Sequence, residues 1–67
     1  MYEIQRNPTE KLIIQKNEFK GKEYIDIRIF YEDEGEYKPT KKGVTFNPDQ
    51  IDEVIKALES IKEESQK

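Results

Sequence analysis

The segment from Glu23 to Tyr31 alternates apolar and polar side chains more strictly than any other part of this chain. In an extended strand, successive side chains point to opposite faces of the sheet. One face therefore carries Ile25, Ile27 and Ile29, and the other carries Tyr24, Asp26, Arg28 and Phe30. The pattern predicts a long central strand, and the rest of the chain has to pair with it and cover its apolar face.

Two shorter extended segments precede this strand. Tyr2 and Ile4 alternate with polar neighbours, and Asn7-Pro8-Thr9 is typical of a turn because Pro8 cannot continue a ladder. Residues 11–16 contain a β-branched run that favours a second strand. We expect residues 17–22, which include Gly21, to form a loop before the central strand.

A polar segment and a returning strand follow. Glu32–Glu36 is too polar to bury and contains Gly35, so we expect it to form the exposed tip of a long hairpin. The chain returns from Tyr37 to Phe46, but residues 38–43 contain Pro39 and do not fit a regular interior strand. We expect residues 44–46 to pair as the fourth strand.

Asn47-Pro48-Asp49-Gln50 is a strong helix start, with Asn47 as the cap and Gln50 completing a capping box. The helix is expected to begin at Pro48, and residues 62–67 are expected to fray. One apolar stripe recurs at spacings of three and four residues, formed by Ile51, Val54, Ile55, Leu58 and Ile61. The sheet can cover part of this stripe, and the same helix of a second copy can cover the rest, because positions 51, 54, 58 and 61 follow a coiled-coil seam.

Chain length explains why a partner is expected. A chain of 67 residues forms one domain, and with 33% hydrophobic and 40% charged residues its apolar burial barely exceeds the entropy lost on folding. Cysteine and histidine are absent, so disulfides and His or Cys metal sites do not supplement the core. We therefore predict an α+β domain over residues 1–67, a four-stranded antiparallel sheet followed by one C-terminal helix, in an obligate homodimer.

The net charge of −3 argues at first against a polyanionic partner, but its distribution is uneven. Residues 1–46 hold nine Lys or Arg against nine Asp or Glu, and residues 47–67 hold three against six. A local basic surface on the sheet is therefore compatible with the acidic total. No apolar run is long enough to span a bilayer and no signal-peptide pattern follows Met1, so we expect a soluble intracellular protein with no membrane partner.

Aromatic and basic residues come close together along the sheet segments, at Phe19-Lys20-Gly21-Lys22, at Arg28, Phe30 and Tyr31, and at Lys38, Lys41 and Lys42. Single-strand recognition uses these residue types, since cations follow phosphates and exposed rings stack on unpaired bases. Two interpretations of Phe19 stay open: a ring presented to bases, or a plug in the hairpin core. Lys41 and Lys42 equally suit a solvated surface, and Arg28 suits an ion pair with Asp26, a phosphate clamp, or both.

Several short motifs recur here at fixed separations: Phe19-Lys20-Gly21-Lys22, Ile25-Asp26-Ile27-Arg28, Tyr31, and Lys38-Pro39-Thr40-Lys41-Lys42-Gly43-Val44. In order and spacing they resemble the transcriptional coactivator family called positive cofactor 4, from about Tyr2 to Ile61. The resemblance implies a curved sheet, dimerisation through the helices, and two grooves for antiparallel single strands.

Carried over by position, the resemblance assigns base stacking to Phe19 and Tyr31. It assigns phosphate contacts to Lys20, Lys22, Arg28, Lys38, Lys41 and Lys42, and close backbone approach to Gly21 and Gly43. Four positions depart from the family pattern: Ile51 stands where tryptophan is frequent and Ile29 replaces a usual acid, which suggests a remodelled core or dimer seam, and the other two lie in the proposed groove. Tyr31 stands where tryptophan is common, which predicts weaker stacking, and Thr40 replaces a usual glycine in the lysine-rich stretch.

The resulting expectation is a non-catalytic protein that prefers single-stranded or unwound DNA and acts in transcription regulation or single-strand handling. RNA stays open, because stacking and phosphate contacts do not read the 2′-hydroxyl. We expect no catalysis, no cofactor and no metal, and partners among transcription or replication proteins. If the protein is prokaryotic, we expect it in the cytoplasm, associated with the nucleoid. If it is eukaryotic, we expect it in the nucleus. The alternative is a homodimeric protein-interaction module whose lysines only solvate the sheet.

Overall fold

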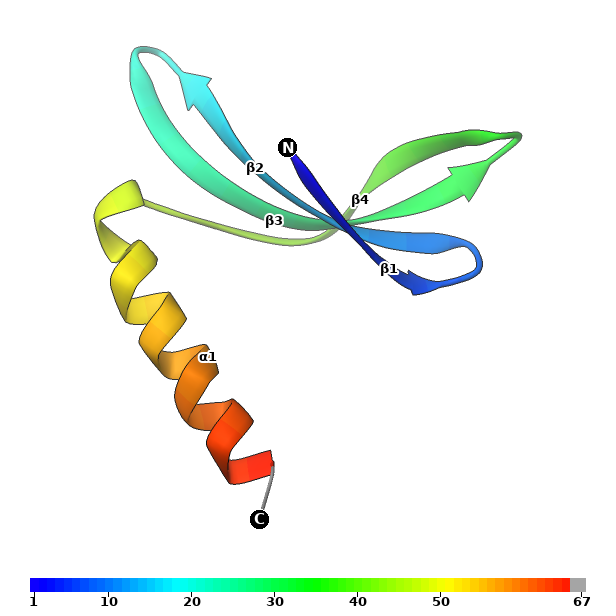
Figure 1. Cartoon of the computed structure of the whole chain (residues 1–67). Helices are drawn as coiled ribbons and strands as arrows, with labels where there is room; N and C mark the ends of the chain where they lie inside the picture. Colours follow the sequence, from blue (N-terminus) through cyan, green and yellow to red (C-terminus); the bar gives the residue numbers. More distant parts are fainter. Residues whose placement is uncertain (66–67) are drawn as a thin grey trace.

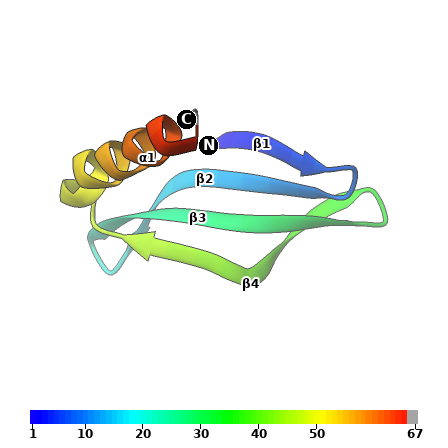
Figure 2. The same ribbon diagram turned by 90° about the horizontal axis from the view of Figure 1, so that it is seen from below.

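The computed structural model describes residues 1–65 as one open antiparallel sheet followed by a helix. The strands β1 (Tyr2–Asn7), β2 (Glu10–Phe19), β3 (Lys22–Asp33) and β4 (Glu36–Phe46) lie side by side in chain order (Figures 1 and 2). A 3-10 turn (Pro48–Gln50) leads into α1 (Ile51–Ser65). The predicted fold class is confirmed, and β3, the segment with strict alternation, pairs with a strand on each side.

Both long hairpins close in two-residue turns. The expectation of a loop over residues 17–22 is therefore wrong. β2 continues to Phe19, which pairs with Lys22, and only Lys20 and Gly21 form the turn. Their φ angles of 52° and 79° are both positive, as a type I′ turn requires, and such a turn matches the twist of the flanking strands. The acidic tip closes in the same way at Glu34-Gly35.

β4 is continuous from Glu36 to Phe46, so the expected break over residues 38–43 is also corrected. Pro39 is tolerated because β4 lies at the edge of the sheet. The irregularity that the sequence indicated takes the form of a bulge, since the pairing register shifts between Arg28 and Phe30 of β3.

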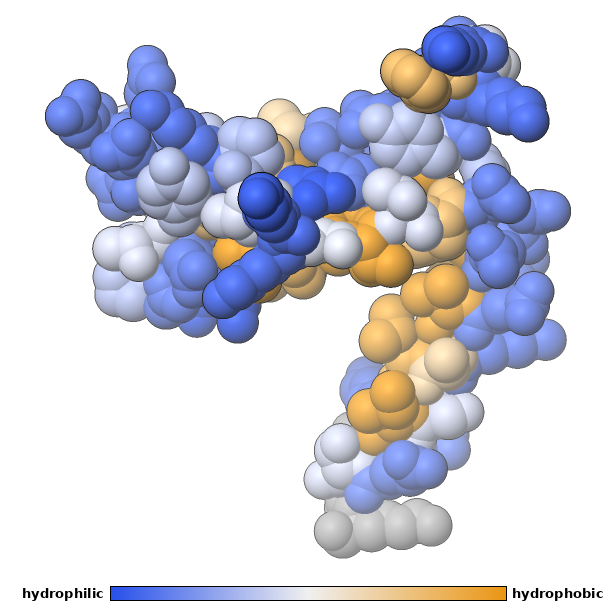
Figure 3. Space-filling view, turned by 180° about the vertical axis from the view of Figure 1, so that it is seen from behind, coloured by the Kyte–Doolittle hydropathy of each residue, from blue (hydrophilic) through white to orange (hydrophobic). Residues whose placement is uncertain are grey.

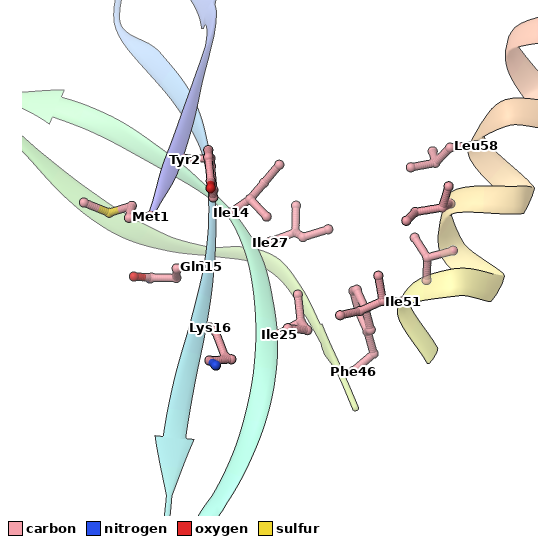
Figure 4. A pocket seen from close by; sticks show the side chains of 12 residues that line it. Met1, Tyr2, Ile14, Gln15, Lys16, Ile25, Ile27, Phe46, Ile51 and Leu58 are labelled. Atoms are coloured by element: carbon pink, nitrogen blue, oxygen red, sulfur yellow. The ribbon is translucent and has the colours of Figure 1, made fainter. Parts of the chain in front are cut away.

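One face of the sheet turns toward α1. Figure 4 shows Ile14, Ile25, Ile27 and Phe46 pointing toward the helix, and Ile51 and Leu58 pointing back toward the sheet. Between them lies an apolar cleft of about 400 Å³. In Figure 3 the hydrophobic surface runs along the helix and onto the adjoining part of the sheet. The helix therefore stands beside the sheet without closing over it.

The start of the helix follows the sequence signal. The backbone N–H of Asn47 donates to Oε1 of Gln50 at 3.3 Å, which is one half of the predicted capping box. The first turn is 3-10, so the α-helix itself begins at Ile51. Its end differs from the expected fraying of residues 62–67, because α1 continues to Ser65, whose hydroxyl donates to the carbonyl of Ile61 at 2.9 Å. Gln66 and Lys67 lie outside the described residues.

The interior of a single chain is thin. Among residues 1–65, Ile13 is the one buried hydrophobic side chain, 3% exposed, whereas Leu58 of the helix stripe is 59% exposed. The radius of gyration is 14.0 Å, against about 11 Å expected for a compact domain of this length. One chain therefore leaves much of its apolar surface open. Within the described residues, α1 lacks the length and apolar character needed to cross a bilayer.

Candidate nucleic-acid interface

Phe19 lies at the end of β2, directly before the Lys20-Gly21 turn. Its side chain is 65% exposed, so the ring does not plug the hairpin core. The ammonium group of Lys20 stands 5.5 Å from the centre of the ring, within reach of a cation–π interaction. The hairpin tip thus presents an aromatic face and a cation together, and Lys22 pairs across the ladder with Phe19.

Tyr31 lies near the other end of β3 and is 40% exposed. It pairs with Lys38 on β4 and with Glu10 on β2. The ammonium group of Lys38 also forms an ion pair with Asp33 at 2.8 Å. The second predicted stacking ring is therefore open, but its neighbouring cation already has a carboxylate partner.

The structure does not bring the two rings together within one chain. Lys22, the partner of Phe19, and Tyr31 lie nine positions apart on β3, which corresponds to about 30 Å of strand at about 3.3 Å per residue. The β2–β3 and β3–β4 turns stand at opposite ends of the sheet (Figures 1 and 2). Alternation also places Phe19 and Tyr31 on different faces locally, although sheet twist rotates these faces between the ends.

Arg28 occupies the middle of β3 between the two rings. Its Nη2 and Nε donate to the two carboxylate oxygens of Asp26 at 3.2 and 3.4 Å, and its Nη1 donates to the carbonyl of Thr40 at 2.8 Å. Asp26 is 5% exposed, so this ion pair is partly desolvated and not an isolated surface contact. Arginine has five N–H groups, and these three bonds leave two for an additional acceptor such as a phosphate.

Gly43 is the partner of Arg28 on β4. A Cβ atom at this position would lie 2.7 Å from Cζ of Arg28, closer than real contacts allow. The structure thus gives a reason for this glycine that the sequence did not suggest, since it makes room for the guanidinium group. Its predicted role in letting a nucleic-acid strand approach stays a prediction.

The bulge of β4 carries Lys41 and Lys42, both exposed. Thr40 precedes them, and its hydroxyl donates to the carbonyl of Ile29 at 2.7 Å and accepts from the N–H of Lys42 at 3.1 Å. Thr40 has no positive φ, so the departure from the family's usual glycine is compatible with this backbone. Sequence reasoning singled out Thr40 only as a departure and did not find its bonds.

The lysines of the sheet divide into paired and unpaired groups. Lys11 pairs with Glu3 at 3.0 Å and Lys16 with Glu23 at 2.9 Å, and the hydrogen bond to the carboxylate is the main reason that each lysine pKa is raised. The Lys11 ammonium also lies 4.3 Å from the centre of the Tyr37 ring, a contact that the sequence pattern did not reveal. Within residues 1–65, four of the predicted phosphate-contacting lysines form no ion pair: Lys20, Lys22, Lys41 and Lys42.

The apolar stripe of the helix has a half-buried part and an exposed part. Ile51 and Val54 are half-buried beside the chain's own sheet, whereas Ile55, Leu58 and Ile61 are 46%, 59% and 55% exposed. The predicted seam therefore faces the sheet at the first helical turn and is open farther along. Within the described residues, no three Asp or Glu side chains come together as a metal site.

Comparisons with known proteins point in one direction. The family model described as Transcriptional Coactivator p15 (PC4) matches residues 7–57. A Drosophila melanogaster protein described as an RNA polymerase II transcriptional coactivator is 33% identical over 48 residues, covering 72% of this chain and 44% of that protein. The present chain thus spans less than half the length of this relative.

Solved structures agree with the family match. A crystal structure of a PC4 homolog from Burkholderia pseudomallei, in an orthorhombic form, superposes with a TM-score of 0.89 at 25% identity over 92% of this chain and 85% of that one. MoSub1, crystallised as a complex with single-stranded DNA, superposes with a TM-score of 0.63 at 33% identity over 96% of this chain and 75% of that one.

Proposed function

Because the chain belongs to the transcriptional coactivator p15 (PC4) family, we propose that it binds single-stranded or unwound DNA without strong sequence specificity. The protein is non-catalytic in this proposal and acts in transcription regulation or in the handling of exposed single strands. The kinship with a coactivator from Drosophila melanogaster supports the transcriptional role. The complex of MoSub1 with single-stranded DNA supports the choice of ligand.

The observation that carries the proposal is the exposed ring of Phe19 beside Lys20 and Lys22, which form no ion pair within residues 1–65. A ring that is 65% exposed at a hairpin tip offers a flat apolar face, and unpaired bases stack on such a face without sequence preference. Double-stranded DNA keeps its base faces inside the stack, so this contact favours single strands. Lys20 and Lys22 flank the ring and supply positive charge for the backbone phosphates.

We propose a path for the bound strand along the remaining site residues. From the Phe19 hairpin, the path follows β3 past Arg28 and the Lys41-Lys42 bulge toward Tyr31. Because the two rings stand about 30 Å apart along β3, one strand contacts both rings only if it extends along most of the sheet. Bases between the rings are held through their phosphates in this arrangement.

We also propose that the functional unit is a homodimer with the helix stripe at its centre. Three residues of the stripe and the apolar cleft beside them are open in the single chain. A second helix with the same heptad-like spacing is complementary to this surface, because positions 51, 54, 58 and 61 follow a coiled-coil seam. Dimerisation would supply the apolar burial that a 67-residue chain lacks.

A titration against labelled oligo-dT and a matched duplex at two salt concentrations tests the function. The proposal predicts preference for the single strand and a log-log salt slope of about 0.7 for each phosphate neutralised. Absence of binding at low salt would instead favour the second candidate, a homodimeric protein-interaction module. The open apolar cleft between sheet and helix is the observation that supports this second candidate.

A further inference from the structure

The bulge in β4 adds two residues to one strand and none to its neighbour. Between the pairs Arg28–Gly43 and Phe30–Pro39, β3 contributes Ile29 alone, whereas β4 contributes Thr40, Lys41 and Lys42. Backbone groups in a bulge lie outside the regular ladder and need other partners. The conformation of this segment therefore depends on side-chain hydrogen bonds.

Thr40 takes part in these bonds through its side-chain hydroxyl and its backbone carbonyl. Its hydroxyl donates to the Ile29 carbonyl at 2.7 Å and accepts from the N–H of Lys42 at 3.1 Å. Its own carbonyl accepts from Nη1 of Arg28 at 2.8 Å, and the same guanidinium is held by the buried carboxylate of Asp26. Thr40 thus joins the bulge to the central strand at two points, and its hydroxyl also holds the Lys42 N–H within the bulge.

We propose that Thr40 is a positioning residue, whose hydroxyl fixes the Lys41-Lys42 bulge so that both ammonium groups can meet phosphates of one bound strand. The inference rests on the proposed function, because it assumes that these lysines contact a nucleic acid. Both lysines are exposed and unpaired within the described residues. Fixing their backbone before binding lowers the ordering entropy that binding would otherwise cost.

A purely structural role for the hydroxyl makes a different prediction. Loss of the hydroxyl would then lower stability without changing how salt affects binding. In the positioning role, loss of the hydroxyl weakens the contribution of the two lysines, and the effect disappears when both lysines are absent. The two roles are therefore separated by the coupling between position 40 and positions 41 and 42.

The test compares Thr40→Val, which keeps shape and removes the hydroxyl, with Thr40→Ser, which keeps the hydroxyl. Oligo-dT affinity and its salt dependence are measured for both variants, alone and with Lys41→Ala and Lys42→Ala. Thr40→Val is expected to weaken binding about 2- to 10-fold, and Thr40→Ser is expected to bind like the wild type. Replacing both lysines with alanine is expected to lower the salt slope by about 1.4. In that double variant, Thr40→Val should cause no further loss of affinity.

The outcomes separate this inference from the proposed function. Wild-type protein that does not bind oligo-dT would overturn the function, whereas wild-type binding together with full binding by Thr40→Val would overturn only the role of Thr40. Equal weakening by Thr40→Val with and without the two lysines would also overturn it. Should Thr40→Val fail to fold, amide hydrogen exchange on the wild type decides: a Lys42 N–H that exchanges as a free amide would contradict the bond.

Discussion

Gly43 lies directly opposite Arg28 in the β3–β4 pair, and a Cβ atom at position 43 would meet Cζ of Arg28 at 2.7 Å. The Gly43→Ala substitution should displace the guanidinium from Asp26 and from the Thr40 carbonyl. A buried carboxylate that loses its donors, in a site that is also overpacked, costs roughly 1–3 kcal/mol of unfolding free energy. Urea unfolding measures this loss; a variant as stable as the wild type would show that Arg28 does not need the space.

A substitution of Phe19 should change DNA affinity without changing stability, because the ring is 65% exposed. Phe19→Ala should reduce oligo-dT affinity about 5- to 150-fold, which corresponds to the roughly 1–3 kcal/mol of one stacked base. Phe19→Tyr keeps a ring and serves as the matched control. Fluorescence anisotropy measures binding, and thermal unfolding confirms that the fold is intact. Unchanged affinity of Phe19→Ala would remove the ring from the interface.

A substitution at Tyr31 is expected to raise the affinity for oligo-dT. It is 40% exposed, and a tryptophan there offers a larger stacking face. Tyr31→Trp should therefore strengthen oligo-dT binding about 2- to 5-fold, and Tyr31→Phe should leave it nearly unchanged. The same anisotropy titration measures both variants. Equal affinity in all three proteins would indicate that no base stacks at this end of β3.

Leu58 tests the proposed dimer, since it is 59% exposed in the single chain although it belongs to the apolar stripe. Both subunits carry the substitution, so Leu58→Gln should raise the dimer dissociation constant by at least about 10- to 150-fold, the range that corresponds to the roughly 1.5–3 kcal/mol of one buried leucine. Glu59→Gln, one position along the helix and outside the stripe, is the control. Sedimentation equilibrium gives the constants, and a monomeric wild type would refute the dimer directly.

The sequence predicted the elements that depend on hydrophobic periodicity or on a helix-capping motif. Alternation in β3, the Asn47–Gln50 helix start and the stripe of α1 all correspond to observed elements. The β2–β3 loop was predicted too long, because the turn uses Lys20 at a positive φ, a conformation that non-glycine residues rarely adopt. The β4 break was wrong because Pro39 is compatible with an edge strand, and edge position is a property of the whole sheet.

The candidate site was predictable in composition but not in arrangement. The sequence left two interpretations of Phe19 open, a ring presented to bases or a plug in the hairpin core, and the structure has the ring exposed. Sequence spacing did not reveal that Thr40 accepts a hydrogen bond from Arg28, nor that Gly43 makes room for the Arg28 guanidinium. These relationships depend on cross-strand register, which a bulge shifts without a clear signal in the sequence.

An NMR titration of the labelled protein with oligo-dT tests most directly whether bases stack on the exposed rings of Phe19 and Tyr31. The account predicts that the ring protons of Phe19 and Tyr31 shift and show contacts to thymine protons, and that the backbone amides of Lys41 and Lys42 shift with them. Shifts confined to the α1 stripe and the apolar cleft, with both rings unchanged at saturating oligo-dT, would contradict it.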